Sequence, residues 1–523
     1  SLVLLLTGPA AFAAGEQEEA GPATTQSDEG VQLPGEYREA PVLARLVESG
    51  ELPPVDERLP DVPFVVGPGV LNGEEYVDWE PGQYSDGRDL RTMAMASKVS
   101  VMDISPSNLL WAPDQTSEDL MPLLLEDYAY SEDYTEFHLT IRRGLKWSNG
   151  DPVTTEDVRF TFEDLYENDD IGITYPTNLY AQGNTQNPVA ELTIRDQYSF
   201  SLAFDRPYGF FLVDLRSWIT DPNMLLRPST FLKQYHPDYT ETEKLEQMAE
   251  EAGLIDWQQL LSVKADNHWA RSRNPAQVGV PHLQPWSPVE ITDTRVVIER
   301  NPYYPMVDTE GKQLPYIDRV VNDIVADMDA ALVKAMSGEV DYVIDDFIRL
   351  AHMPLFLEGA DRGEYGVLLA GGFNSPPLLY INQDYDYENP DSQWQQLMQD
   401  PEKRFGRAVA LAIDKEDVND SLYFGMYGMD DLITGSEYDP GEANLLLDDL
   451  GMTERDRDGF RRYPDGSPLE IVIHTHGLSP DQVDVSFMIA QYLQKIGIDA
   501  TARQVAPPIF DERITNNEFM MTV

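Results

Sequence analysis

The chain has 523 residues, of which 92 are acidic and 37 are basic, so its formal net charge is −55, and it contains no cysteine. Hydrophobic residues make up 42% and aromatic residues 10% of the chain, which is enough for a folded core and excludes a wholly disordered protein. A surface this negative repels phosphate backbones and disfavours nucleic-acid binding. Because the sequence contains no cysteine, it excludes disulfides, thiol catalysis and cysteine zinc sites among these residues, and we expect no lipid anchor on an N-terminal cysteine.

The acidic excess is accompanied by few lysines, since only ten of the basic residues are lysine. Abundant Asp and Glu with little Lys is typical of a surface kept soluble in strong salt. An ordinary acidic secreted protein is the alternative interpretation.

The first residues resemble the end of a secretory leader. An apolar run, Leu2–Leu6, is too short to span a bilayer and leads into Ala11-Phe12-Ala13, a pattern that signal peptidases cut after. We therefore interpret residues 1–14 as a signal-peptide remnant and expect a soluble, exported product, with a short buried helix as the alternative. Residues 15–84 are acidic and rich in Pro and Gly, which predicts a linker or an extended wrap around a surface.

From about residue 85 the pattern becomes globular. Tyr134–Ile141 alternates apolar and polar residues and predicts a strand. Thr154–Asp157 then supplies a helix cap, followed by Val158, Phe162 and Leu165 at helical spacing.

Further elements follow in the same alternating manner. Strands are predicted at Glu191–Ile194, Ser199–Phe204, Thr294–Glu299, Val340–Ile344, Leu469–His474 and Ile498–Val505, and helices at Asp329–Met336, Lys403–Ile413 and Val485–Lys495. The order predicts an α/β protein with mixed sheets. Asn516–Val523 has the character of a strand entering the core, so we expect a truncated C-terminus.

Motifs that carry chemistry are weak. Paired carboxylates such as Asp345-Asp346 arise by chance in so acidic a chain, and Glu454–Gly459 imitates a calcium loop but begins with Glu, so a turn is expected. His474 and His476 share one strand face without a third ligand, which predicts structural histidines. With no nucleophile elbow, phosphate loop, zinc helix or dinucleotide turn, we expect neither enzyme activity, nor a metal, nor a cofactor.

Several aromatic residues lie outside periodic segments, in stretches rich in Pro, Asn and Gln: Trp111, Trp286, Tyr303, Tyr304 and Trp394. Such loop aromatics suit a cleft that stacks on sugars or packs peptide side chains. Packing under long loops is an equally good interpretation of each.

The segment Leu145–Val158 resembles the signature of the family 5 extracellular solute-binding proteins, the oligopeptide- and dipeptide-binding components of ABC importers. Other segments similar to that family follow in order: Val297–Tyr304, Val307–Asp318, Ser337–Asp341 and Arg407–Val418. The resemblance extends from about Gly87 to the last residue.

The resemblance implies a two-lobed periplasmic-binding-protein fold of type II, in the large form with an extra subdomain. Lobe I would span residues 85–325 with the subdomain at about 115–190, and an incomplete lobe II would span 326–523. Trp147 would be a packed aromatic residue and Asp157 a helix cap, both structural.

The function implied is the capture of oligopeptides between closing lobes and their delivery to an ABC permease in the inner membrane, by a periplasmic monomer without enzyme activity. The predicted ligand-binding residues are Asn108, Trp111, Trp286, Asn382 and Gln383. The same role for oligosaccharides is the alternative. A secreted glycan-active hydrolase and a purely structural cell-surface protein are the alternatives of other classes.

Overall fold

The computed structural model describes residues 33–71, 79–95, 107–113, 120–216, 224–266, 273–325, 328–343, 350–367, 377–389, 391–426, 437–476 and 480–523. The predicted signal-peptide remnant, residues 1–14, lies outside the described residues. Within these ranges, no helix combines the length and apolar character needed to cross a membrane.

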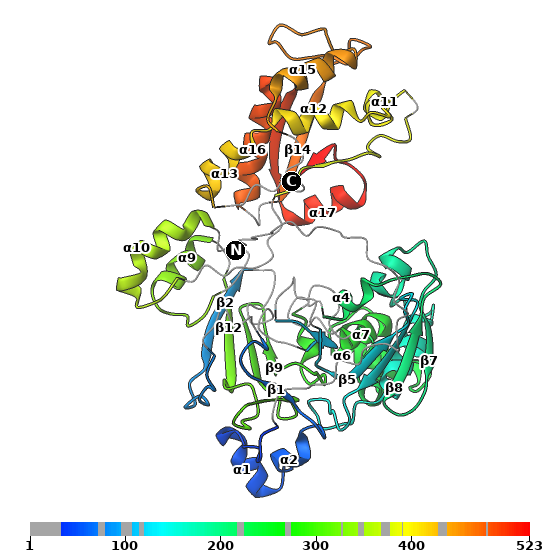
Figure 1. The fold of residues 1–523 in the computed structure, drawn as a ribbon, viewed down its shortest axis with the longest axis vertical. Helices are drawn as coiled ribbons and strands as arrows, with labels where there is room; N and C mark the ends of the chain where they lie inside the picture. The colour runs from blue at the N-terminus through cyan, green and yellow to red at the C-terminus, as the bar shows by residue number, and fades with distance from the viewer. Residues whose placement is uncertain are drawn as a thin grey trace, which may run out of the picture. The chain divides into compact units, whose positions relative to one another are not determined.

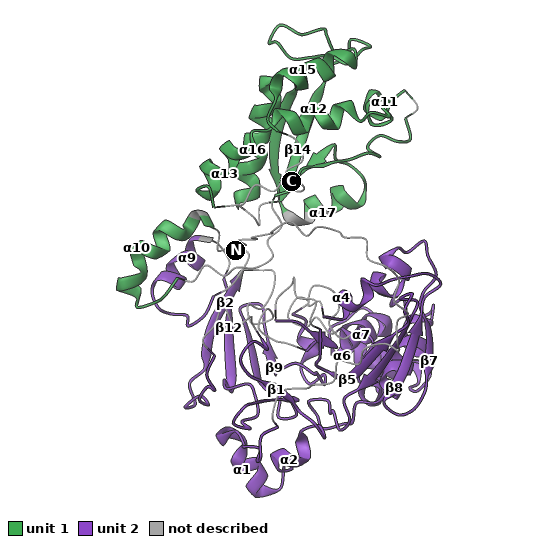
Figure 2. Cartoon of the chain, viewed as in Figure 1, with its two compact units in different colours: residues 1–13, 345–523 green, residues 14–344 purple. Residues whose placement is uncertain are grey.

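The described residues divide into a larger unit, residues 33–343, and a smaller unit, residues 350–523 (Figure 2). This boundary falls later than the predicted boundary after residue 325. The reason is helix α9 (Met328–Met336), which packs against two strands of the larger unit. The ammonium of Lys334 on α9 also pairs with the Asp323 carboxylate at 2.8 Å.

The described part of the acidic N-terminal segment belongs to the larger unit and packs against the rest of it. It forms helices α1 (Pro41–Ser49) and α2 (Val55–Arg58) and strand β1 (Phe64–Val66), which pairs in parallel with β11 (Met306–Asp308). A small core joins these elements and consists of Val55, Leu59, Val65 and Val307. Of the two predictions for this segment, the described residues agree with the wrap, although α1 and α2 make part of it helical rather than extended.

The first sheet of the larger unit has the order β2 (Leu90–Met95), β12 (Arg319–Val325), β10 (Arg295–Arg300) and β9 (Trp286–Ile291). β2 and β12 are parallel and the other pairs are antiparallel. The core of this sheet contains Trp286, Ile291, Val296, Ile298 and Val320. The strand predicted at Thr294–Glu299 is confirmed as β10.

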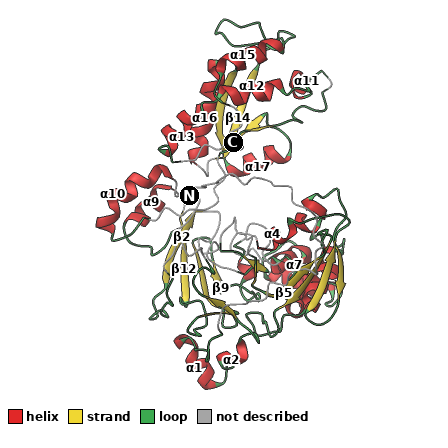
Figure 3. Cartoon of the chain, viewed as in Figure 1, coloured by secondary structure: helices red, strands yellow, loops and turns green. Residues whose placement is uncertain are grey.

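The second sheet is antiparallel, in the order β5 (Leu125–Tyr130), β6 (Glu136–Ile141), β8 (Ser199–Ala203) and β7 (Glu191–Ile194), and is drawn in yellow in Figure 3. The predicted strand and hairpin are confirmed here. The alternation in β6 places Phe137, Leu139 and Ile141 in the core. Helices α4 (Phe211–Arg216), α6 (Thr242–Glu251) and α7 (Trp257–Ala265) contribute to the same hydrophobic cluster (Figure 1).

The segment with the family signature begins helix α3 (Thr155–Arg159), which continues as a wider π-type turn at Phe160–Tyr166. The Thr154 hydroxyl accepts the Glu156 N–H at 3.2 Å, and the Asp157 carboxylate accepts the Thr154 N–H at 3.0 Å. The predicted cap is therefore confirmed. Short elements complete the larger unit: β3 (Leu110–Trp111), β4 (Met121–Pro122), α5 (Ser229–Leu232) and 3-10 turns at Thr177–Leu179, Ala181–Gly183, Lys233–Tyr235 and Pro275–Gln277.

The smaller unit has a sheet in the order β13 (Tyr380–Ile381), β16 (Met521–Thr522), β14 (Glu470–His476) and β15 (Asp499–Val505). β14 runs parallel to both β15 and β16. Its helices are α10 (Met353–Gly363), α11 (Gln393–Met398), α12 (Arg404–Ala412), α13 (Lys415–Tyr423), α15 (Pro440–Asp449), α16 (Pro480–Lys495) and α17 (Pro507–Thr515), with a 3-10 turn at Leu350–His352. The predicted helices α12 and α16 and the predicted strands β14 and β15 are confirmed.

The strand predicted at Val340–Ile344 is wrong for its described residues, 340–343. The N–H groups of Asp341 and Tyr342 both donate to one carbonyl, that of Arg91 on β2, at 2.7 and 3.3 Å. The Asp341 carboxylate also pairs with the Arg91 guanidinium at 2.7 Å. The segment is thus held at a single residue of β2, and no strand ladder forms.

The calcium-like segment Glu454–Gly459 forms the predicted turn. The Oδ1 atom of Asp456 accepts the N–H groups of Asp458 and Phe460, both at 2.9 Å. In the part of the chain that the structure describes, no three His, Asp or Glu side chains are grouped to hold a metal ion.

The acidic excess predicts that salt stabilises the fold. Raising KCl from about 0.1 M to about 1 M shortens the Debye length from about 10 Å to about 3 Å, which screens repulsion between surface carboxylates. We expect the midpoint of thermal unfolding to rise by about 5 °C or more, corresponding to roughly 2 kcal/mol. Calorimetry in KCl, with sucrose of equal osmolality as the control, measures this. A midpoint that stays level in KCl would show that repulsion between surface carboxylates does not limit the stability of the fold, contrary to the salt-adapted interpretation.

Candidate functional site

The five predicted ligand-binding residues are divided between the two units. Asn108, Trp111 and Trp286 belong to the larger unit, and Asn382 and Gln383 to the smaller one. Ligand contact stays a prediction for all five, and their surroundings within each unit show which side chains have free surface.

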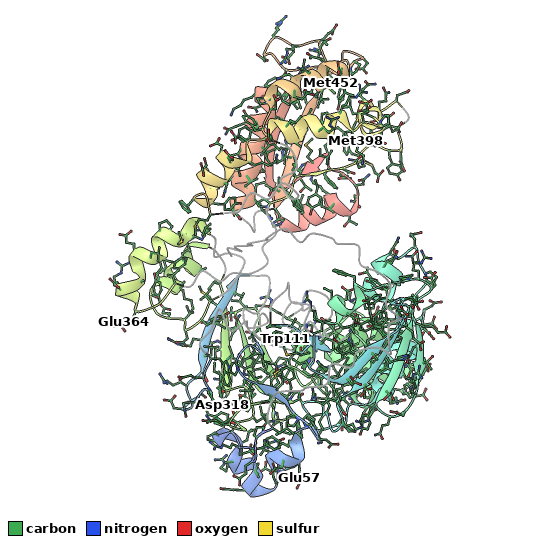
Figure 4. All side chains as sticks on the ribbon, viewed as in Figure 1. Glu57, Trp111, Asp318, Glu364, Met398 and Met452 are labelled. Carbon is green, nitrogen blue, oxygen red and sulfur yellow. The ribbon has the colours of Figure 1, made fainter. Side chains whose placement is uncertain are left out.

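Two of these residues lie at β3. The side chain of Asn108 is buried, and its amide donates to the backbone carbonyl of Arg216 at 2.5 Å, which ties β3 to the end of α4. Trp111 is half-buried within the larger unit (Figure 4), and its indole N–H donates to the carbonyl of Val70 at 2.8 Å. Part of the Trp111 side chain therefore stays accessible, whereas the Asn108 amide is engaged with the backbone of Arg216.

Trp286, the first residue of β9, is 5% exposed. Its indole N–H donates to the carbonyl of Ile317 at 3.0 Å, and its ring belongs to the core of the first sheet. The Trp286 side chain thus packs in the core of the sheet. Packing was the second interpretation that the sequence allowed for this residue.

Asn382 follows β13 and is held by its neighbours. Its side-chain amide donates to the Asn517 side chain and to the Phe519 carbonyl, both at 2.7 Å, and its own carbonyl accepts the indole N–H of Trp394 at 2.8 Å. Gln383 is exposed. Of the two, Gln383 has the more accessible side chain.

A further group of side chains gathers at the carboxyl end of β14. His474 lies on β14, and its registered neighbour on the parallel strand β15 is Arg503. His476 follows at the end of β14, where its ring meets that of Phe510 edge-on at 5.2 Å. In α/β sheets, ligands bind at the carboxyl ends of parallel strands. This end of the sheet is therefore a candidate site.

The electrostatics of His474 are unusual. It is 5% exposed, and neither ring nitrogen has a hydrogen-bond partner among the described residues. Burial lowers the pKa of His474, and the positive charges of Arg513 and Arg503 lower it further. The imidazole is therefore neutral near pH 7 and offers one donor and one acceptor.

The same arrangement places positive charge in a chain whose net charge is −55. A neutral imidazole beside the guanidinium groups of Arg503 and Arg513 suits a carboxylate, because guanidinium groups bind carboxylates through charge-assisted hydrogen bonds. The sequence indicated only structural histidines here. The sequence signal for this site was the pair of histidines at the end of a strand. The two arginines could not be predicted, because they lie on later elements. Arg503 reaches this end of the sheet only because β14 pairs with β15.

Comparison with known proteins identifies a family. The family described as bacterial extracellular solute-binding proteins, family 5, matches residues 119–523. The periplasmic alpha-galactoside-binding protein of Rhizobium meliloti is 25% identical over 514 residues, covering 88% of this chain and 67% of that protein. The chain spans 61–67% of the length of this and other curated relatives that it matches.

Two solved structures are similar in fold. An oligopeptide-binding protein, OppA, is 29% identical with a TM-score of 0.60, and the match covers 93% of this chain and 74% of that one. The periplasmic binding protein MelB of Agrobacterium fabrum C58, in complex with stachyose, is 20% identical with a TM-score of 0.65, covering 96% and 74%. The second likeness shows the fold alone.

Proposed function

The chain belongs to family 5 of the bacterial extracellular solute-binding proteins, the substrate-binding components of ABC transporters, and from this we propose that it captures oligopeptides for import. The resemblance seen in the sequence and the expected solute-binding fold are thereby confirmed. The family acts outside the cytoplasm. The proposal includes four parts: an oligopeptide as the ligand, its capture by closure of the lobes, its delivery to an inner-membrane permease, and the absence of enzyme activity.

The observation that carries the peptide proposal is the basic end of β14. An oligopeptide has a carboxylate at its C-terminus, and Arg503 and Arg513 beside a neutral His474 complement it. A neutral oligosaccharide has no such group. The accessible side chains of Trp111 and Gln383 are proposed as further contacts.

The test compares free peptides with the same peptides amidated at the C-terminus. In titration calorimetry, we expect amidation to weaken binding about tenfold, because it removes the charge that the guanidinium groups meet. Arg503→Gln should weaken binding of the free peptide by a similar factor and leave binding of the amidated peptide unchanged. Arg407→Gln, an exposed arginine on α12, is the matched control and should change neither. Equal binding of free and amidated peptides would contradict the carboxylate contact.

Oligosaccharides are the second candidate ligand. They are favoured by the alpha-galactoside-binding relative, which matches 88% of this chain, and by the stachyose-bound MelB, which shares the fold. A rise in unfolding temperature with raffinose but with no peptide would establish this alternative. Ligand recovered intact by mass spectrometry supports binding for transport, whereas released monosaccharide would establish the hydrolase.

A further inference from the structure

The larger unit contains a hollow of about 450 Å³ that the proposed function does not use. It lies where the 3-10 turns Thr177–Leu179 and Ala181–Gly183 meet helix α4 and the loop that leads into it, and residues of these segments line it (α4 is labelled in Figure 1). The volume falls within the usual range of small-molecule sites, about 300–1,000 Å³.

The wall of this hollow includes an amide without partners. Asn178 is 4% exposed, and neither its side-chain oxygen nor its side-chain nitrogen has a hydrogen-bond partner among the described residues. Buried polar atoms of this kind cost roughly 1–3 kcal/mol unless a partner satisfies them. The amide therefore calls for a partner that both donates and accepts.

A carboxylate lies on the same wall. The Oδ2 atom of Asp214, on α4, accepts the hydroxyl of Tyr208 at 2.8 Å. Burial raises the pKa of Asp214, and no Lys, Arg or His among the described residues forms an ion pair with it. The group thus retains capacity to accept further hydrogen bonds inside the hollow.

An aromatic ring and a strained turn complete the rim. The side chain of Phe210, which lines the hollow, is 64% exposed. Gln182 has a φ of 61°, in the left-handed region, which is unfavourable for residues other than glycine. Its side-chain amide donates to the Pro207 carbonyl at 3.2 Å. Strained turns of this kind cluster at ligand sites.

We propose that this hollow binds a pyranose ring of a neutral sugar. A hydroxyl both donates and accepts, so adjacent sugar hydroxyls satisfy both atoms of the Asn178 amide and donate to Asp214, while the apolar face of the ring lies on Phe210. An ammonium group only donates and leaves the Asn178 N–H groups unpaired. A carboxylate only accepts and is repelled by Asp214.

This site shares no residue with the carboxylate contact of the peptide proposal, which is assigned to His474, Arg503 and Arg513. Either proposal can therefore fail while the other holds. The two are separated by their ligands as well, since a methyl hexopyranoside carries no carboxylate.

The test locates sugar binding by hydrogen exchange on the full chain. With methyl α-galactopyranoside or methyl α-glucopyranoside in excess, we expect slower exchange in residues 176–184 and 205–216. Phe210→Ala and Asn178→Leu should each weaken sugar binding at least about tenfold, as measured by saturation-transfer NMR. Because the Phe210 ring is exposed, we expect the Phe210→Ala variant to fold normally even if Asn178→Leu does not.

Phe487→Ala is the matched control, because Phe487 is a similarly exposed ring, 47% exposed, on α16 of the smaller unit. It should leave sugar binding unchanged. Protection by butylammonium but not by the sugars would overturn the proposal in favour of an amine site. Absence of protection in both segments, or unchanged binding in the Phe210→Ala variant, would overturn it outright.

Discussion

Replacing Asp157 with alanine should lower the free energy of unfolding of the larger unit by about 4 kcal/mol or more, the largest effect we expect from a single substitution. The carboxylate is 3% exposed and accepts the N–H and hydroxyl of Ser229 at 2.9 and 2.7 Å, the N–H of Thr154 at 3.0 Å and the indole N–H of Trp147 at 3.4 Å. Each buried donor left unpaired costs roughly 1–3 kcal/mol. Chemical denaturation followed by circular dichroism measures the loss.

Two further variants make this prediction specific. Asp157→Asn should produce an intermediate loss, because one amide oxygen still accepts from Ser229 while the amide nitrogen faces the donors of Thr154 and Trp147. Asp86→Ala is the matched control, since the Asp86 side chain is 66% exposed and pairs only with exposed Arg88 among the described residues. Its effect should stay within about 0.5 kcal/mol. If Asp157→Ala behaved like this control, the network would not contribute to stability.

The second large effect on stability is expected at Arg58, whose fully buried guanidinium joins the N-terminal segment, residues 33–71, to the rest of the larger unit. It donates to the Glu39 carboxylate at 2.6 Å, to the carbonyls of Pro53 and Pro302 at 2.9 Å each, and to the Gln313 side chain at 3.0 Å. Arg58→Ala removes all these donors and leaves the Glu39 carboxylate without its partner. Breaking a buried pair in this way costs about 3–5 kcal/mol.

We expect that loss to appear as faster hydrogen exchange in residues 33–71, measured by mass spectrometry. Arg58→Lys should recover part of the protection, because lysine keeps the charge but lacks the planar fork that reaches several acceptors. Arg45→Ala on α1, where the arginine is exposed, is the control and should leave exchange unchanged. Faster exchange confined to the smaller unit would show that Arg58 does not hold the wrap.

The surroundings of the predicted ligand-binding residues depend on contacts that the sequence does not show. The sequence could not distinguish a loop tryptophan that faces a ligand from one that packs under a loop, and Trp286 packs in the sheet core because β9 pairs with β10. Asn382 is held by Asn517 and Phe519, more than a hundred residues later in the chain. Neither arrangement can be predicted from the residues next to Trp286 or Asn382 in the sequence.

Sequence alone determined what depends on neighbouring residues: the family signature at Leu145–Val158, the cap at Thr154 and the alternation of β6, since capping and strand periodicity act over a few positions. Tertiary structure alone decided which distant groups meet. Ser229 reaches Asp157 from 72 positions along the chain, and Arg503 comes to His474 through strand pairing. Local patterns predict elements because short-range sterics and hydrogen bonds form them, whereas sites arise from contacts that exist only once the chain has folded.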